Sequence, residues 1–307
     1  MKPGSDPSLA DGCVDVEVAA TLACLLEASA PKPGNVSPGR HFADSRYEDF
    51  LASAAAIGEP LAGAGTRGLG VTVRRAVEAT ARWVSSNTNL GIVLLLAPLA
   101  RAALLRSSGA SKRGASERAE LRDALREVLG ATTVDDAREV YEAIRLAAPG
   151  GLGRADAQDV ANEPTVTLLE AMRLAADRDG IAREYATSFE VTFERAAPAL
   201  DRARADGLSW DDAIVETFLT LLAAAPDTHV ARRSGAAVAA DVSGRARSVL
   251  DAGGVRSAAG RRAIEDLDRA IRNSTHAANP GTTADLTAAA IFVVLLGGGW
   301  SAARPPA

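Results

Sequence analysis

Apolar residues recur along this chain at intervals of three and four, which is the period of an amphipathic helix. Near the amino end, Val14, Val18, Leu22 and Leu25 follow this period, and segment 92–105 is apolar on nearly every side. The second pattern is typical of a buried central helix. The alternation typical of strands does not occur, so we expect no β-α-β unit. Helices are expected over 14–30, 45–57, 71–85, 92–105, 116–129, 134–147, 165–178, 188–205, 210–224, 229–250, 257–273 and 282–296.

Capping signals mark where several of these helices begin. Ser45 with Glu48 and Ser209 with Asp212 have the spacing of a capping box. No repeat of fixed period and no Pro/Ser-rich linker divides the chain. The sequence therefore predicts an all-α fold, as one compact domain of about ten to twelve helices. We expect a disordered segment at 1–12, the catalytic domain at 13–300 and a frayed tail at 301–307.

The composition indicates which partners and which cellular location to expect. The 307 residues include 34 basic and 39 acidic side chains, so the chain lacks the basic surface of a nucleic-acid binder. Two cysteines exclude a disulfide framework and a cysteine-based zinc site. The amino end has no apolar run of a signal peptide, and the longest apolar runs are shorter than the roughly 20 residues of a membrane span. We expect a cytoplasmic protein without membrane or nucleic-acid partners.

Five connectors are unusually rich in Gly, Pro, Asn and Asp for an all-helical protein. Most of them adjoin a helix amino terminus, where free N–H groups favour anions. Together they offer carboxylates for a hard cation, amides for hydrogen bonds and basic side chains for phosphates. We expect all five to converge on one pocket. They are Pro31–Asn35, Ser86–Gly91, Pro149–Asp159, Asp227–Arg233 and Asn279–Asp285.

Each loop also has a purely structural interpretation. Asn279 before Pro280, and Asp227 before the next helix, are both typical helix caps. Segment 63–68 matches the letters of a dinucleotide-binding motif, but it follows a helix rather than a strand, so we reject that interpretation. Chemistry is therefore indicated by the combination of loops and not by any one of them.

Taken in order, the motifs resemble a known family. The matching residues are Glu27, Pro31-Lys32-Pro33-Gly34, Asn87-Thr88-Asn89-Leu90-Gly91, Pro149-Gly150-Gly151-Leu152-Gly153, Asp227-Thr228-His229 and Asn279-Pro280-Gly281-Thr282-Thr283-Ala284-Asp285-Leu286. They resemble the triphosphoribosyl-dephospho-CoA synthase family over about residues 15–297. The resemblance implies an all-helical enzyme that moves the triphosphoribosyl unit of ATP to a hydroxyl of 3′-dephospho-CoA or a related acceptor and releases adenine. ATP is then a substrate, small-molecule nucleotides are the partners, and Mg²⁺ is the expected cofactor.

The resemblance also implies roles for individual residues. Glu27, Asp44, Asp156 and Asp285 are candidates for stabilising oxocarbenium charge and exchanging protons. Asp156, Asp159 and Asp285 are candidate ligands of Mg²⁺. Nucleotide and phosphate contacts are expected from Lys32, Gly34, Asn35, Asn87, Asn89, Gly91, Gly150, Gly151, Arg232, Arg233, Asn279 and Gly281.

Lys32 is one of only three lysines among the 34 basic residues. It stands between two prolines, and we expect this rigid turn to present its ammonium group to a phosphate.

The chain departs from the family pattern at two motifs. Lyase-associated members carry Thr-His-Lys-Gly where this chain has Thr88-Asn89-Leu90-Gly91, and Asn and His where it has His229 and Arg232. Asp44 is also shifted in register. The Asn-Thr-Asn-Leu-Gly form resembles a divergent branch found among makers of methanopterin-type one-carbon cofactors. The acceptor, the nucleotide or both are therefore expected to differ.

Two alternative functions stay open. A related Mg²⁺-dependent pentosyl transferase or N-ribosyl hydrolase, acting in methanopterin-type cofactor synthesis, would use the same carboxylates. A hydrolase would release free ribose triphosphate without an acceptor. A helical ligand-binding module would show no turnover.

Overall fold

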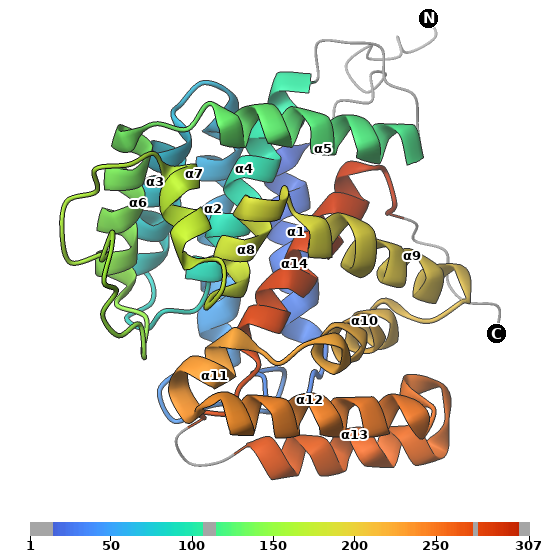
Figure 1. Ribbon diagram of the computed structural model, residues 1–307. Helices are drawn as coiled ribbons and strands as arrows, with labels where there is room; N and C mark the ends of the chain where they lie inside the picture. Colours follow the sequence, from blue (N-terminus) through green and yellow to red (C-terminus); the bar gives the residue numbers. More distant parts are fainter. Residues whose placement is uncertain (1–14, 107–114, 273–275, 301–307) are drawn as a thin grey trace, which may run out of the picture.

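The computed structural model describes residues 15–106, 115–272 and 276–300 (Figure 1). Within these ranges the chain is helical, and the β-pairing is one isolated bridge between Ser37 and Arg40. The predicted all-α single domain is confirmed, while the expected end segments 1–12 and 301–307 lie outside the described residues. The α-helices are α1 (Val16–Ser29), α2 (Tyr47–Ala62), α3 (Leu69–Ala81), α4 (Leu90–Arg106), α5 (Ala115–Gly130), α6 (Val134–Ala147), α7 (Leu168–Ala175), α8 (Gly180–Thr187), α9 (Ala197–Ala205), α10 (Trp210–Ala224), α11 (Thr228–Ser234), α12 (Ala236–Asp251), α13 (Ala258–Ile271) and α14 (Gly281–Leu296).

Fourteen α-helices lie in the described ranges, rather than the ten to twelve expected, for two local reasons. The helix predicted over 229–250 is divided into α11 and α12 at Gly235, whose φ of +92° leaves the helical region. The additional helix α8 begins where the Asp179 side chain accepts hydrogen bonds from the backbone N–H groups of Ile181 and Ala182. Both boundaries adjoin the cavity described below.

Helices α4 and α14 form the centre of the core, as the sequence predicts for segment 92–105. Segments 92–100 of α4 and 288–296 of α14 are buried throughout. A helix that is apolar on every side is stable in water only when other elements surround it. Figure 1 shows α1 beside α14 at the centre, α5 across one end, and α12 and α13 across the other.

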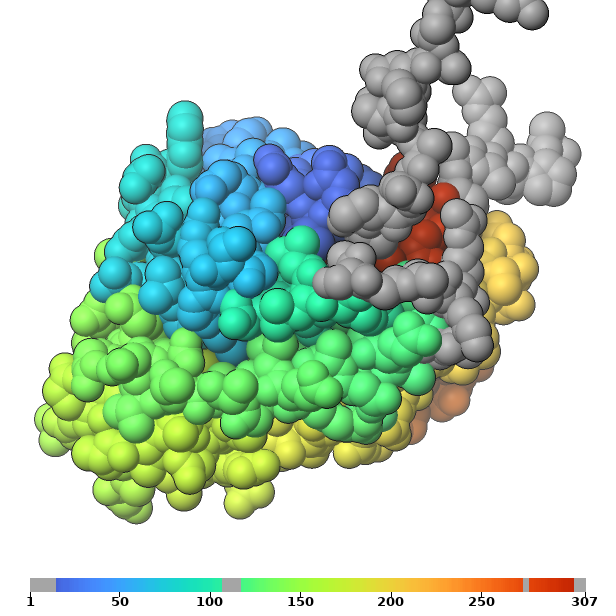
Figure 2. Space-filling model, turned by 90° about the horizontal axis from the view of Figure 1, so that it is seen from above, coloured from blue at the N-terminus to red at the C-terminus, as the bar shows by residue number. Residues whose placement is uncertain are grey.

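Helix α5 covers α4 on one side of the molecule. In Figure 2 this face is seen from above, with green α5 between the blue segment of α2 and α3 and the yellow-green segment of α7 and α8. Among the helices that the structure describes, none has both the length and the apolar character needed to cross a bilayer.

The amino termini of α4, α11 and α14 meet at one side of the core. Asp227 joins two of them, because its carboxylate accepts from the N–H of Val230 at 3.0 Å and from the N–H and hydroxyl of Thr283, each at 2.7 Å. The start of α4 comes equally close to α14: a Cβ at Gly91 would collide with the Asp285 carboxylate. Glycine at position 91 therefore allows the two core helices to approach where the loops converge.

Candidate active site

A cavity of about 630 Å³ lies where the five polar loops meet. This volume is within the roughly 300–1,000 Å³ typical of small-molecule sites. Each loop contributes to its lining, for example through Asn35, Asn87, Gly150, His229 and Asn279. The expectation that the five loops converge on one pocket is confirmed.

Most of the residues singled out in the sequence line this cavity. Those on its surface are Glu27, Asn35, Asp44, Asn87, Asn89, Gly91, Gly150, Arg232, Arg233, Asn279, Gly281 and Asp285. Of the other described candidates, the following lie outside its lining: Lys32, Gly34, Gly151, Asp156 and Asp159.

Lys32 is placed differently from the expectation. Its side chain is 0% exposed, and its ammonium group lies 2.9 Å from the Glu27 carboxylate. It also donates to the backbone carbonyls of Glu27 and Ala30. A buried charge requires such partners, and the last turn of α1 supplies them. Lys32 thus neutralises a cavity-lining carboxylate instead of facing the cavity itself.

Asp285 lies at the floor of the cavity, one turn into α14. Burial raises the pKa of Asp285 well above its ordinary value, and the nearby carboxylates of Glu27 and Asp227 raise it further. A raised pKa favours the protonated form of the carboxyl. The side chain can therefore act as a proton donor.

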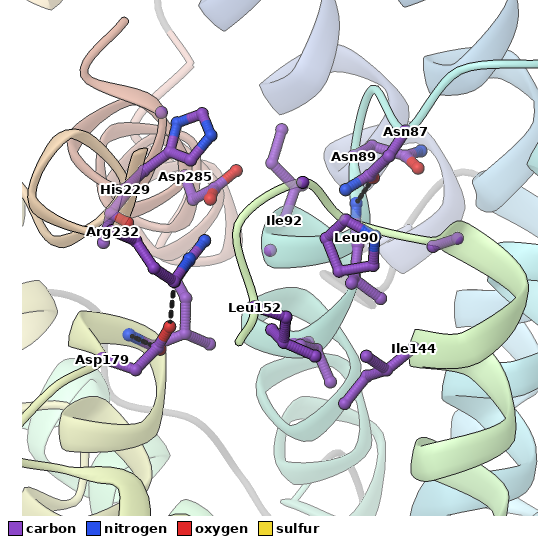
Figure 3. Close-up of a pocket in the computed structure, with 18 of the residues that line it drawn as sticks. Asn87, Asn89, Leu90, Ile92, Ile144, Leu152, Asp179, His229, Arg232 and Asp285 are labelled. Carbon is purple, nitrogen blue, oxygen red and sulfur yellow. Dashed lines mark hydrogen bonds and ion pairs between the residues drawn. The ribbon is translucent and has the colours of Figure 1, made fainter. Parts of the chain in front are cut away.

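His229 lies on the same side of the cavity as Asp285 (Figure 3). Its Nδ1 lies 3.1 Å from the carbonyl oxygen of Asn279. A carbonyl only accepts, so Nδ1 carries the proton and Nε2 of the neutral ring is the acceptor. Burial lowers the pKa of His229, which favours this neutral form. A Cβ at Gly281 would collide with the ring, so the glycine makes room for it.

Two arginines, Arg232 and Arg233, bring positive charge to this end of the cavity. Arg232 forms an ion pair with Asp179, Nη1 to Oδ2 at 2.6 Å, shown as a dashed line in Figure 3. The buried Nε of Arg232 has no hydrogen-bond partner among the described residues. It is a donor available to an anionic ligand.

Sequence reasoning did not identify Asp179 as a site residue. The Asp-Gly pair ahead of an amphipathic segment was the signal that could have found this helix cap. Its contact with Arg232 arises where the amino-terminal ends of α8 and α11 meet, as the bond from the Gly180 N–H to the Thr228 hydroxyl shows, and a local pattern does not contain this.

The cavity asparagines are held by neighbouring side chains and backbone. Asn35 donates to the Asn279 side chain at 3.0 Å, and Asn89 donates to the Thr80 hydroxyl at 3.1 Å. The Asn87 side chain accepts from the N–H of Leu90 at 3.1 Å, at the start of α4. These bonds fix the orientation of polar groups around the cavity before any ligand enters.

The candidate Mg²⁺ ligands do not form a joint site. The Asp159 carboxylate accepts from the N–H groups of Ala155 and Ala161, at 2.6 and 2.8 Å, and so orders its own loop. Asp156 lies on the same loop outside the cavity lining, whereas Asp285 lies on the floor. In the described part of the chain, no three acidic, His or Cys side chains cluster to hold a metal. The residues present therefore do not fit a metal site built by the protein alone.

The opposite end of the cavity is apolar. Figure 3 shows Ile144 and Leu152 on the side away from His229, Asp285 and Arg232. This wall consists of side chains from α6, α7 and the loop between them, namely Val140, Ile144, Leu146, Leu152, Leu168, Met172 and Leu174. It was not anticipated, because its residues have the ordinary spacing of core-facing helix positions.

The sequence of this chain matches a known protein family. A model of the family described as ATP:dephospho-CoA triphosphoribosyl transferase matches residues 13–304. The chain belongs to this family. The resemblance inferred from the five loops is thereby confirmed over nearly the full length of the sequence.

Individual members of the triphosphoribosyl transferase family show how far the similarity extends. A crystal structure assigned as a triphosphoribosyl-dephospho-CoA synthase of Archaeoglobus fulgidus is 29% identical, with a TM-score of 0.62, over 81% of this chain and 99% of that one. Two proteins named "Probable 2-(5''-triphosphoribosyl)-3'-dephosphocoenzyme-A synthase" are also similar. The protein of Pseudomonas syringae pv. tomato is 38% identical over 36% of this chain and 38% of its own. The protein of Pseudomonas paraeruginosa is 37% identical over 40% of this chain and 42% of its own. The chain thus matches about two fifths of the length of these curated relatives.

Proposed function

We propose that this chain transfers the triphosphoribosyl unit of ATP to a hydroxyl of dephospho-CoA or a related acceptor and releases adenine. The observation that carries the proposal is the placement of Asp285, with a raised pKa, beside a neutral His229 and Arg232 in one cavity. A transfer that breaks a C–N bond and forms a C–O bond needs a proton donor, a proton acceptor and a site for the phosphates. This end of the cavity has a candidate for each.

In the proposed reaction the bond between the ribose C1′ and adenine breaks, and the acceptor oxygen bonds to C1′. The Asp285 carboxyl gives its proton to the leaving adenine, because burial raises its pKa and so favours the protonated form before the transfer. His229 Nε2 takes the proton of the acceptor hydroxyl. The two transfers balance, and a proton returned from His229 to Asp285 restores the starting state.

Positive charge develops at C1′ as adenine leaves, and the Glu27 carboxylate on the cavity floor stabilises it. Lys32 keeps that carboxylate compensated between turnovers. Arg232 and Arg233 bind the triphosphate, and Asp179 holds the Arg232 guanidinium in place. Mg²⁺, the expected cofactor, is supplied with the nucleotide, since this ion is commonly held by one or two carboxylates together with substrate phosphates.

Leu90 favours a related acceptor as a second candidate within the same chemistry. It lines the cavity and is buried at the motif where lyase-associated members carry lysine. An apolar group at this point removes a cation from the site. An acceptor of the pentosyl unit that carries fewer phosphates, as in methanopterin-type cofactor synthesis, would be compatible with the loss of this positive charge.

The test is to incubate the protein with ATP and Mg²⁺, with and without dephospho-CoA, and to follow adenine by chromatography. Acceptor-dependent adenine release and a product heavier by one triphosphoribosyl unit support the proposal. Adenine together with free ribose triphosphate in the absence of acceptor would identify a hydrolase. No adenine with either mixture, despite nucleotide binding, would identify a binding module.

A further inference from the structure

The wall formed by Val140, Ile144, Leu146, Leu152, Leu168, Met172 and Leu174, called the apolar chamber below, has no role in the proposed chemistry. None of these seven side chains is charged. Tyr141 lies beside them, but its hydroxyl already donates to the Gln158 carbonyl at 2.7 Å. The chamber therefore offers a ligand contact area rather than hydrogen bonds.

Two charges of opposite sign, Arg178 and Asp159, lie near Tyr141 at the chamber. Burial is the main cause that raises the pKa of Tyr141, Asp159 raises it further and Arg178 lowers it. The unpartnered Arg232 Nε is instead at the other end of the cavity (Figure 3). A polyphosphate is therefore expected to bind at the end with Arg232 rather than against the seven apolar side chains.

Three leucines of the chamber remain open to solvent. Leu146 is 50% exposed, Leu152 41% and Leu174 59%, and each comes from a different element: α6, the loop before α7, and α7 itself. Single exposed leucines are ordinary, but three that gather on one cavity mark a surface for an apolar ligand.

We propose that the apolar chamber binds the uncharged pantetheine arm of the acceptor. This inference rests on the proposed function, in which the acceptor is dephospho-CoA or a relative of it. Such a molecule has two unlike parts, an anionic adenosine diphosphate and a long uncharged chain of methylene, methyl and amide groups. The apolar chamber matches the uncharged chain, while Arg232 and Arg233 are assigned to the triphosphate of ATP, so the chamber selects the acceptor by its arm.

The test compares the binding of dephospho-CoA with that of ADP, which lacks the arm, by calorimetry on the full chain. We expect the wild type to bind dephospho-CoA at least about tenfold more tightly. The double variant Leu146→Asn, Leu152→Asn should lose most of this ratio and bind ADP as the wild type does. Leu105→Asn is the matched control, because Leu105 is also 50% exposed but does not line the cavity. Leu174→Asn provides a second variant on another helix.

Equal affinity of the wild type for both nucleotides would overturn the inference, and so would an unchanged ratio in both the double variant and Leu174→Asn. Adenine release in the same preparations separates this failure from that of the proposed function. Tight, arm-dependent binding of dephospho-CoA without adenine release overturns the proposed function alone. Absence of dephospho-CoA binding overturns both.

Discussion

Two acidic regions of this molecule use the same side chain in opposite ways. On the cavity floor, burial and the neighbouring carboxylate of Glu27 raise the pKa of Asp285. In the loop before α7, two backbone N–H groups, from Ala155 and Ala161, lower the pKa of Asp159. Both had been expected to bind a metal. Their surroundings make one a candidate proton donor and the other an anion that orders a loop.

The largest effect is expected from Asp285→Asn. An amide cannot donate a proton as a carboxylic acid does, so acceptor-dependent adenine release should fall by about 10²–10⁴-fold. Stability at neutral pH should not fall, because the amide resembles the protonated carboxyl in charge and shape. Chromatography of adenine and urea unfolding measure the two quantities. Near-normal activity would remove Asp285 from the reaction.

Because the Lys32–Glu27 ion pair is also buried, we expect a large loss of stability in Lys32→Met. Removal of one partner from a buried ion pair costs about 3–5 kcal/mol in unfolding free energy, because the Glu27 charge is left without its partner. Urea unfolding measures this loss. Arg232→Met provides the contrast, since the Arg232–Asp179 pair is partly exposed and should contribute only about 1 kcal/mol.

Adding Glu27→Gln to Lys32→Met should restore most of the lost stability, since the unpaired charge is then removed. Equal unfolding midpoints for Lys32→Met and Arg232→Met would contradict the expectation that breaking the buried ion pair costs more stability than breaking the partly exposed one.

The two aspartates should also respond to pH with opposite sign. Asp285 has a raised pKa in the fold, so its contribution to stability is complete below about pH 4, the ordinary aspartate value, and declines as pH rises through the raised pKa. Asp159 has a lowered pKa, so its contribution is complete above about pH 4 and is lost as pH falls through the lowered value. Unfolding free energies of the wild type and each Asn variant, compared across pH, measure both. If both contributions changed with pH in the same direction, the contrast between the two aspartates would be wrong.

The smallest effect is expected from Asp159→Asn. Its carboxylate accepts bonds only from its own loop among the contacts described, and it lies outside the cavity lining. Adenine release should stay within about twofold of the wild type. A loss as large as that of Asp285→Asn would place Asp159 in the chemistry after all, with magnesium titration of both variants as the direct check.

Much of the fold could be predicted because its signals are local. The apolar character of segment 92–105 on nearly every side indicated α4 as a core helix, and its burial confirms this. Asp227 was interpreted as a helix cap, and its bond to Val230 confirms this. Its second pair of bonds, to Thr283, joins residues 56 positions apart and has no local signature.

By itself the sequence determined the all-helical class, the polar loops that meet at one cavity and the family to which the chain belongs. These follow from residue spacing and from motif order, which are properties of the chain alone. Only the tertiary structure decided that Lys32 turns inward to Glu27, that the pKa of Asp285 is raised, and that an apolar wall faces the charged loops. Burial and charge pairing depend on side chains brought together from distant positions, so they arise only when the helices pack.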